Sequence, residues 1–417
     1  MSGKASLLVV AGFSLVFLVV AQNFGGISNR AVDNYVNYQT ETFAHNIAIS
    51  GANIMSDSVY WNPGFSGSYS KEFQGGQLNA SVTIINAATG YREIVSTGTF
   101  QGKSSTIRLR IAPSSFSQYA YYSTWEKASP GGGDIWWIGG DVVYGPFHTQ
   151  DDLRVFNHPA FLGEYTSHKG NLIYYSSKKN DSPVITGVYE PGKSIEIPDN
   201  AVKDLEPEAD ADGYKFSGHD TVYVTFDKDT LRYKYSYSDP YSSFALNDSV
   251  PNGLIYAKDC LVRLQGTVRG RYTIACDSVS SVPGKGTIWL DNDIVYETDP
   301  NVDPNSKDLL GIVAENNVKI TDNFANSYGN SINIDASIFC ENWGFGADNY
   351  KKRSVSGDIN LLGGIQQNFR QPVGTFSSKY GVTSGFTKKY DYDPRLAYMS
   401  PPFYPGTGGF KIVSWLE

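Results

Sequence analysis

The sequence predicts a mainly β protein with a long N-terminal α-helix, a small antiparallel sheet and then an irregular parallel β-helix. Three observations lead to this fold class. An uncharged apolar segment near the N-terminus runs into a helix-forming segment, three alternating segments follow, and short strand–turn–strand units then recur. A β-sandwich is the alternative for the last part, because it also has short strands separated by turns. We expect boundaries at 1–60, 61–115 and 116–417, with an insertion at about 171–250.

The helix is predicted from residues 6–21, SLLVVAGFSLVFLVVA, which carry no charge. This length lies between the apolar part of a signal peptide and the roughly 20 residues of a membrane span. Downstream apolar residues recur at helical spacing and no proline occurs before Pro63, so we expect one retained helix to about residue 59. The alternative is a signal peptide that is cleaved after Ala21.

The β-rich part begins with a predicted meander. Residues 77–86, 91–100 and 104–111 are short alternating segments joined by turn residues. From about residue 116, short apolar strands alternate with Gly, Asn and Asp, as in 253–264 and 286–296. The interval of roughly 20–30 residues is in the range of solenoid repeats.

Composition excludes some classes of function. The net charge is −8, and no concentrated basic face is present, so we expect no nucleic-acid partner. Three cysteines (Cys260, Cys276 and Cys340) are too few for a disulfide framework, and a Cys260–Cys276 bridge is left open.

The segment Ala31–Asn53 (AVDNYVNYQTETFAHNIAISGAN), together with C-terminal motifs such as 310–318 and 370–376, carries a family resemblance. The chain is similar to type IV pilins and PilX-like minor subunits, within a large uncharacterised family of bacterial envelope proteins that share a domain of unknown function. The resemblance implies processing at Gly3, with Leu8 where a major pilin has Glu, and hence a minor or tip subunit. It also implies a membrane and assembly helix that includes Leu7, Leu8, Ala11, Gly12, Leu15, Phe17 and Leu18.

Two sets of polar residues are candidates for a catalytic or metal-binding site. His148, Asp151, Asp152 and His158 can bind a metal or act in acid–base catalysis, but their spacing is not diagnostic and a corner of the solenoid explains the aspartates. The acidic run of Asp204, Glu206, Glu208, Asp210 and Asp212 offers oxygen ligands for calcium, but it lacks the ligand order of an EF-hand. A solvated acidic segment is the simpler interpretation, and we expect no cofactor.

The sequence therefore predicts a non-enzymatic structural protein of the cell envelope, a minor or tip subunit of a type IV pilus or pseudopilus-like assembly, with a role in adhesion or secretion. We expect it in the inner membrane or in a surface filament, with the body periplasmic or extracellular. The expected partners are other pilin-like subunits, the membrane and surface glycans. The alternatives are a secreted β-helix enzyme acting on polysaccharide, with His148, Asp151 and Arg154 as first suspects, or a soluble secreted binding module.

Overall fold

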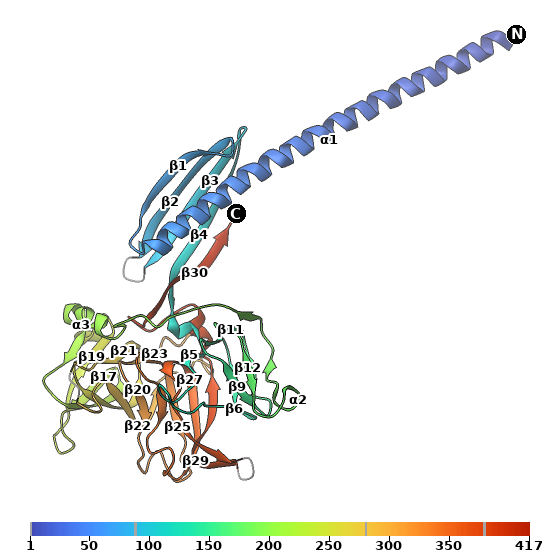
Figure 1. Cartoon of the computed structure of the whole chain (residues 1–417). Helices are drawn as coiled ribbons and strands as arrows, with labels where there is room; N and C mark the ends of the chain where they lie inside the picture. Colours follow the sequence, from blue (N-terminus) through green and yellow to red (C-terminus); the bar gives the residue numbers. More distant parts are fainter. Residues whose placement is uncertain (1, 87–89, 280–281, 378–380) are drawn as a thin grey trace. The chain divides into compact units, whose positions relative to one another are not determined.

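The computed structural model describes residues 2–86, 90–279, 282–377 and 381–417. They form two compact units (Figure 1). Unit 1 comprises Met1–Pro113 and Gly409–Glu417, and unit 2 comprises Ser114–Gly408. Each unit is described separately below.

Unit 1 consists of one long helix and a five-stranded sheet. Helix α1 (Ser2–Trp61) precedes strands β1 (Gly67–Phe73), β2 (Gly76–Asn86), β3 (Tyr91–Phe100) and β4 (Lys103–Ser115). Strands β1 to β4 pair antiparallel with their sequence neighbours, and β30 (Gly406–Leu416) lies beside β4. The helix and the meander that the sequence predicts are both confirmed.

The C-terminal part of α1 packs on this sheet through small and apolar side chains. The buried helix residues recur every three or four positions, which places them on one face. The approach is close: a Cβ at Gly98 of β3 would overlap the carbonyl oxygen of Ala44. Burial of a side chain such as Met55 or Val59 contributes about 1.5–3 kcal/mol to stability. The buried positions are Thr40, Ala44, Ile47, Ala48, Gly51, Ala52, Met55 and Val59.

Unit 2 is a parallel β-helix, in which equivalent residues of successive coils align. One row of such residues is formed by five isoleucines on β19 (Leu254–Ala257), β21 (Arg271–Cys276), β23 (Leu309–Ala314), β25 (Ile332–Cys340) and β27 (Val355–Phe369). Figure 1 shows β19, β21 and β23 side by side. Parallel pairing identifies a solenoid, because sandwich sheets are antiparallel. The mainly β fold class with a parallel β-helix is therefore confirmed. The row contains Ile255, Ile274, Ile312, Ile338 and Ile365.

The coils are not stacked in sequence order. Strand β27 pairs with β25 on one side and with β5 (Tyr121–Trp125) on the other, where Ile365 faces Tyr121. From β5 the row continues with aromatic residues on β8 (Phe147–Thr149), β11 (Tyr165–Ser167) and β14 (Tyr189–Pro191). Unit 2 therefore has two halves, β5–β14 and β15–β29, which meet between β27 and β5.

Because β14 and β15 (Tyr214–Phe216) lie at opposite ends of the ladder, residues 192–213 must connect the two ends. We call this segment the strap. Its apolar residues, including Ile195, Val202 and Leu205, cover the outer side of the isoleucine-bearing strands. Polar contacts also hold it, because the backbone N–H groups of Asn200 and Val202 donate to the Glu341 carboxylate over 3.1 and 2.9 Å.

The sequence predicts an insertion at about 171–250, but several strands of this segment are part of the solenoid. Strands β13 (Val184–Ile185) and β14 pair in parallel with β10 (Ala160–Leu162) and β11, and β15 and β16 (Thr221–Lys228) pair in parallel with β19 and β20 (Leu261–Val268). These strands therefore belong to the coils, because their ladder hydrogen bonds are continuous with those of their neighbours.

Candidate functional site

The N-terminal part of α1 is the most distinctive surface of unit 1. Every side chain of residues 3–39 is exposed, and this part of the helix extends beyond the sheet (Figure 1). Among the helices of the described residues, α1 alone is long enough and apolar enough to cross a membrane. The residues that the sequence assigns to a membrane and assembly helix all lie here: Leu7, Leu8, Ala11, Gly12, Leu15, Phe17 and Leu18.

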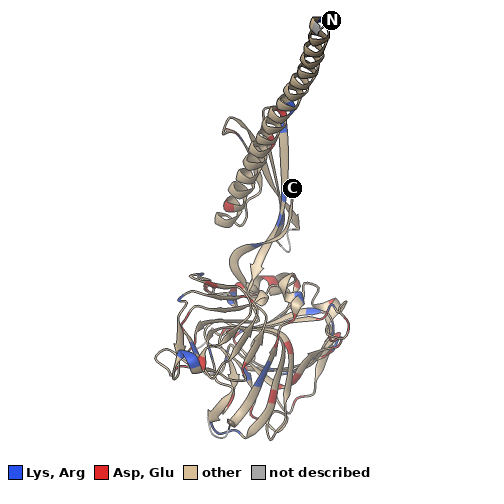
Figure 2. Cartoon of the chain, turned by 90° about the vertical axis from the view of Figure 1, so that its right-hand side faces the viewer, with Lys and Arg blue, Asp and Glu red and all other residues tan. Residues whose placement is uncertain are grey.

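Two properties make this segment compatible with lipid. No charged residue occurs between Lys4 and Arg30, and Figure 2 shows a long uncharged stretch of helix. The backbone groups are paired inside the helix, and the Ser14 hydroxyl donates to the Val10 carbonyl over 2.9 Å. Internal pairing matters because hydrocarbon offers no substitute partner for a polar group. The helix is continuous through both candidate processing positions, Gly3 and Ala21.

The next segment, residues 22–39, has a mixed character. Phe24, Ile27 and Val32 are exposed, and they alternate with Asn, Gln, Arg30 and Asp33. Such a mixture is less suited to lipid than to other protein surfaces, where charged and amide groups find partners. The helix thus presents an apolar part and a mixed part before its first buried residue, Thr40.

His148 lies in unit 2 on β8, away from solvent. Its Nδ1 is 2.7 Å from the Thr166 hydroxyl, and its ring stacks on Tyr122 with the centroids 5.3 Å apart. Burial lowers the pKa of His148 to about 4. At neutral pH it is therefore an uncharged part of the core, which suits packing rather than catalysis.

The other members of this cluster each have their own partner. Asp151 pairs with Lys169 over 2.6 Å and with Arg154 over 3.5 Å. Burial opposes ionisation of Asp151, but the two cations hold its pKa below the ordinary value. Asp152 accepts a hydrogen bond from Asn171 over 2.9 Å, and His158 Nδ1 lies 2.8 Å from the Ser182 carbonyl. Each of the four polar side chains is thus engaged with a different partner.

The acidic run folds into two short helices beside the solenoid, η2 (Lys203–Leu205) and α3 (Glu206–Asp212). Helical residues two apart point in different directions, so Asp204, Glu206, Glu208, Asp210 and Asp212 do not share one face. Glu206 accepts from Lys258 over 2.6 Å and from Lys215 over 3.2 Å, and Asp210 also pairs with Lys215. In the part of the chain that the structure describes, no group of three or more His, Cys, Asp or Glu residues is arranged to hold a metal ion.

The three cysteines are buried and free. Cys276 Sγ lies 2.9 Å from the Cys260 carbonyl oxygen. Burial raises the pKa of Cys260 to about 12, so its thiol is protonated and unreactive at neutral pH.

Sequence reasoning missed a buried charged network where the halves of unit 2 meet. Glu126, fully buried, accepts hydrogen bonds from the Arg370 guanidinium (2.9 Å), the Trp137 indole (3.0 Å) and the Ser123 hydroxyl (2.6 Å). The Arg370 guanidinium also lies 3.9 Å from the centre of the Trp137 ring. A glutamate that is followed by lysine looks like a surface residue in a sequence, so no local pattern reveals this network.

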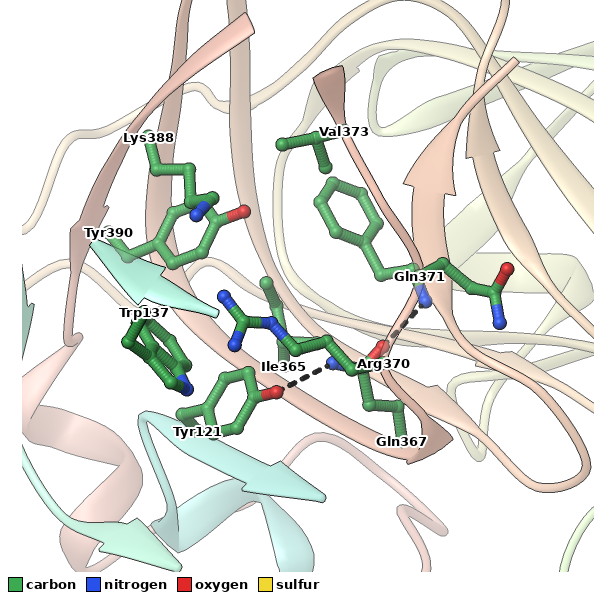
Figure 3. Close-up of a pocket in the computed structure, with 10 residues that line it drawn as sticks. Tyr121, Trp137, Ile365, Gln367, Arg370, Gln371, Val373, Lys388 and Tyr390 are labelled. Carbon is green, nitrogen blue, oxygen red and sulfur yellow. Dashed lines mark hydrogen bonds between the residues drawn. The ribbon is translucent and has the colours of Figure 1, made fainter. Parts of the chain in front are cut away.

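A small cavity lies next to this network. Its volume is about 20 Å³, enough for about one water molecule. Figure 3 shows Tyr121, Trp137, Arg370 and Lys388 around it. Lys388 pairs with Asp141 over 2.8 Å, and burial lowers the pKa of the Lys388 ammonium. A space of this size holds no substrate. Arg370 follows β27 and Glu126 follows β5, so their ion pair joins the two halves of unit 2.

Comparison with known proteins gives limited matches. A family model described as a domain of unknown function (DUF4900) matches residues 77–169, less than half of the chain. No curated protein matches the sequence. Among solved structures, the chain is similar to the competence-associated pilin ComZ from Thermus thermophilus, with 11% identity over 90% of this chain and 97% of that chain and a TM-score of 0.33.

Proposed function

We propose that this chain is a pilin-like subunit of the cell envelope, held in the membrane or in a filament by the N-terminal part of α1. The observation that carries the proposal is the division of this single helix. Every side chain of residues 3–39 is exposed, whereas residues 44–59 supply the helical side of the unit 1 core. One end of the helix is thus built into the folded unit, and the other is available for an environment outside the chain.

Water is a poor environment for the exposed end. Side chains such as Leu8, Phe13 and Phe17 are more than half exposed, and transfer of each from water would gain about 1.5–3 kcal/mol. An apolar surface of this length marks a contact with lipid or with protein. The small residues Ala11 and Gly12 permit close approach of another helix.

A filament role is supported by the segment that follows. Residues 22–39 mix exposed apolar side chains with Arg30 and Asp33, which suits packing between helices of neighbouring subunits. A simple lipid anchor would need no such segment between the membrane and the sheet. We therefore favour assembly through α1 over anchoring alone.

Within such an assembly we propose a minor or tip position for this non-enzymatic subunit. The resemblance to pilins places Leu8 where repeating subunits have Glu, and unit 2 is much larger than the sheet of unit 1. The β-helix would be displayed outward for adhesion or secretion. The polar side chains that suggest catalysis, His148 and Asp151, are engaged with Thr166 and with Lys169 and Arg154.

The test uses the full chain and the double variant Leu15→Arg/Phe17→Arg, with Tyr237→Arg, an exposed position of unit 2, as the matched control. After cell breakage, the full chain and the control should remain with membranes or sheared filaments, and the double variant should be released. Retention of the double variant would contradict the proposal. N-terminal sequencing of the retained protein then distinguishes an intact helix from removal of residues 1–21.

A further inference from the structure

Two neighbouring coils of unit 2 carry long loops at the same corner. One loop (321–331) connects β24 (Val318–Ile320) to β25, and the other (348–354) connects β26 (Phe345–Ala347) to β27. Because β24 pairs with β26 and β25 pairs with β27, the loops begin and end side by side. We call them the corner loops. In solenoids, insertions of this kind gather on one face, which is often the binding face.

The first corner loop holds two aromatic rings in solvent. Phe324 is 80% exposed and Tyr328 is 73% exposed. Their ring centroids are 6.1 Å apart, with 38° between the planes. Single exposed aromatics are common on proteins, but a neighbouring pair on one loop forms a small apolar platform.

Buried polar groups fix this loop in place. The Asn326 side chain is fully buried and donates to the carbonyl oxygens of Leu290 (3.2 Å) and Asp291 (3.1 Å). The Arg353 guanidinium, also buried, donates to the carbonyl oxygens of Asn326 (2.6 Å) and Asp348 (3.2 Å). Arg353 therefore ties the second corner loop to the first.

The conformation of Tyr328 also indicates an imposed geometry. Its φ is +59°, a region that a bulky residue rarely adopts and that costs of order 1–3 kcal/mol. The neighbouring contacts stabilise it, because the Tyr328 N–H donates to the Ser354 hydroxyl over 2.7 Å and the Gly329 N–H to the Val355 carbonyl over 3.0 Å. The backbone that carries the ring is thus fixed by contacts within the corner loops.

Two asparagines on the corner loops, Asn330 and Asn349, add amide side chains to this surface. Asn330 Nδ2 donates to the Phe324 carbonyl over 2.9 Å, and Asn349 Nδ2 donates to Asp322 over 3.2 Å. Both asparagines are exposed. Each side-chain amide has two N–H groups and one oxygen, so these contacts leave capacity for another ligand.

We infer that the corner loops bind a glycan, with the apolar face of a sugar ring on Phe324 and Tyr328 and its hydroxyls on Asn330 and Asn349. A sugar presents both kinds of surface that the loops offer. A protein partner is a poorer fit, because a stable interface buries roughly 800 Å² on each side. Two aromatic side chains supply about 300–500 Å² at most. The inference deepens the proposed adhesive role and depends on unit 2 being displayed outward.

The test measures binding of the full chain, in detergent micelles, to immobilised hexasaccharides of glucose, N-acetylglucosamine, mannose and galactose. We expect at least one of them to bind. The variants Phe324→Ala and Tyr328→Ala should each weaken that binding about tenfold or more, whereas Tyr237→Ala, an equally exposed tyrosine (83%) elsewhere on unit 2, should leave it unchanged. Asn330→Ala should give a smaller loss, because one of several hydrogen bonds is removed.

Three results would overturn the inference: no binding to any of the four sugars, binding that Phe324→Ala leaves intact, or an equal loss with Tyr237→Ala. Binding to phosphatidylcholine vesicles that depends on Phe324 would indicate a lipid surface instead. Phe324→Ala should leave the membrane or filament retention of the chain unaltered, because the residue is exposed and lies outside α1. Failure of the glycan inference is thereby separated from failure of the proposed assembly role.

Discussion

The Arg370 guanidinium lies 2.9 Å from the fully buried Glu126 carboxylate, where the two halves of the β-helix meet. The row of aligned isoleucines ends here at Ile365, which faces Tyr121, the first aromatic residue of the row in the other half. The ion pair crosses from one half to the other. It is therefore suited to fixing which coils become neighbours.

We predict that Arg370→Met destabilises unit 2 by about 3–5 kcal/mol, because Glu126 is left buried without its cation. The double variant Glu126→Gln/Arg370→Met should recover part of this loss. Denaturant unfolding, followed by the fluorescence of the chain in detergent, measures both. As the control, Arg232→Met removes an exposed partner of Asp227 and should cost no more than about 1 kcal/mol. Equal losses in Arg370→Met and Arg232→Met would contradict a special role for the buried pair.

We predict that His148 makes unit 2 less stable in acid. Its pKa is about 4 in the fold, below the ordinary histidine value of 6.5, because burial disfavours the charged form. As the pH falls from about 6.5 to about 4, the unfolded chain takes up a proton that the folded chain does not, and stability is lost. His148→Gln, which cannot titrate, should have a flatter dependence of unfolding free energy on pH in this window. An identical pH dependence in both proteins would contradict the assignment.

We predict that Gly98→Ala unfolds unit 1 or separates α1 from its sheet. A Cβ at this position has no space between β3 and the helix backbone at Ala44 and Ala48. Limited proteolysis should then cut within the sheet or the buried part of α1. The matched control is Gly26→Ala, where the added methyl meets no atom within 4 Å and should stabilise the helix by about 0.5–1 kcal/mol. A Gly98→Ala protein as resistant to protease as the control would show that the close packing is absent.

We predict that removal of residues 2–26 yields a soluble, folded chain. Every described side chain that this change removes is exposed, so no hydrophobic cluster of the fold loses a member. Circular dichroism and size exclusion without detergent provide the measurement. If the shortened chain aggregates with loss of β structure, the apolar helix is part of the fold rather than a handle for membrane or filament.

The helix and the meander could be predicted because their signals are local. Uncharged residues 6–21 and the alternation in 77–111 require no knowledge of distant contacts. The stacking of Tyr121 on Ile365 could not be predicted, because strand pairing between segments 244 residues apart leaves no trace in either one. Residues 142–163 come early in the chain, yet their strands lie beyond the last coil of the other half.

The candidate site residues show the same limit. His148 and Asp151 attract notice as a polar cluster, and the structure gives them partners in the core. Nothing in the sequence distinguishes Phe324 and Tyr328 from the many aromatic residues that are buried, yet both face solvent. The local sequence shows which functional group each residue carries. Whether that residue is exposed depends on which coils stack above and below it.

The stacking order of the coils has a consequence for biosynthesis. A ribosome releases β5 long before β27, so the first half of the β-helix keeps an open edge until residue 369 has emerged. The sheet of unit 1 likewise waits for β30, the final strand. An interrupted translation product would therefore lack a closing strand in both units at once. Such fragments would be visible to proteases and chaperones, and the fold would mature only in chains that reach their last strand.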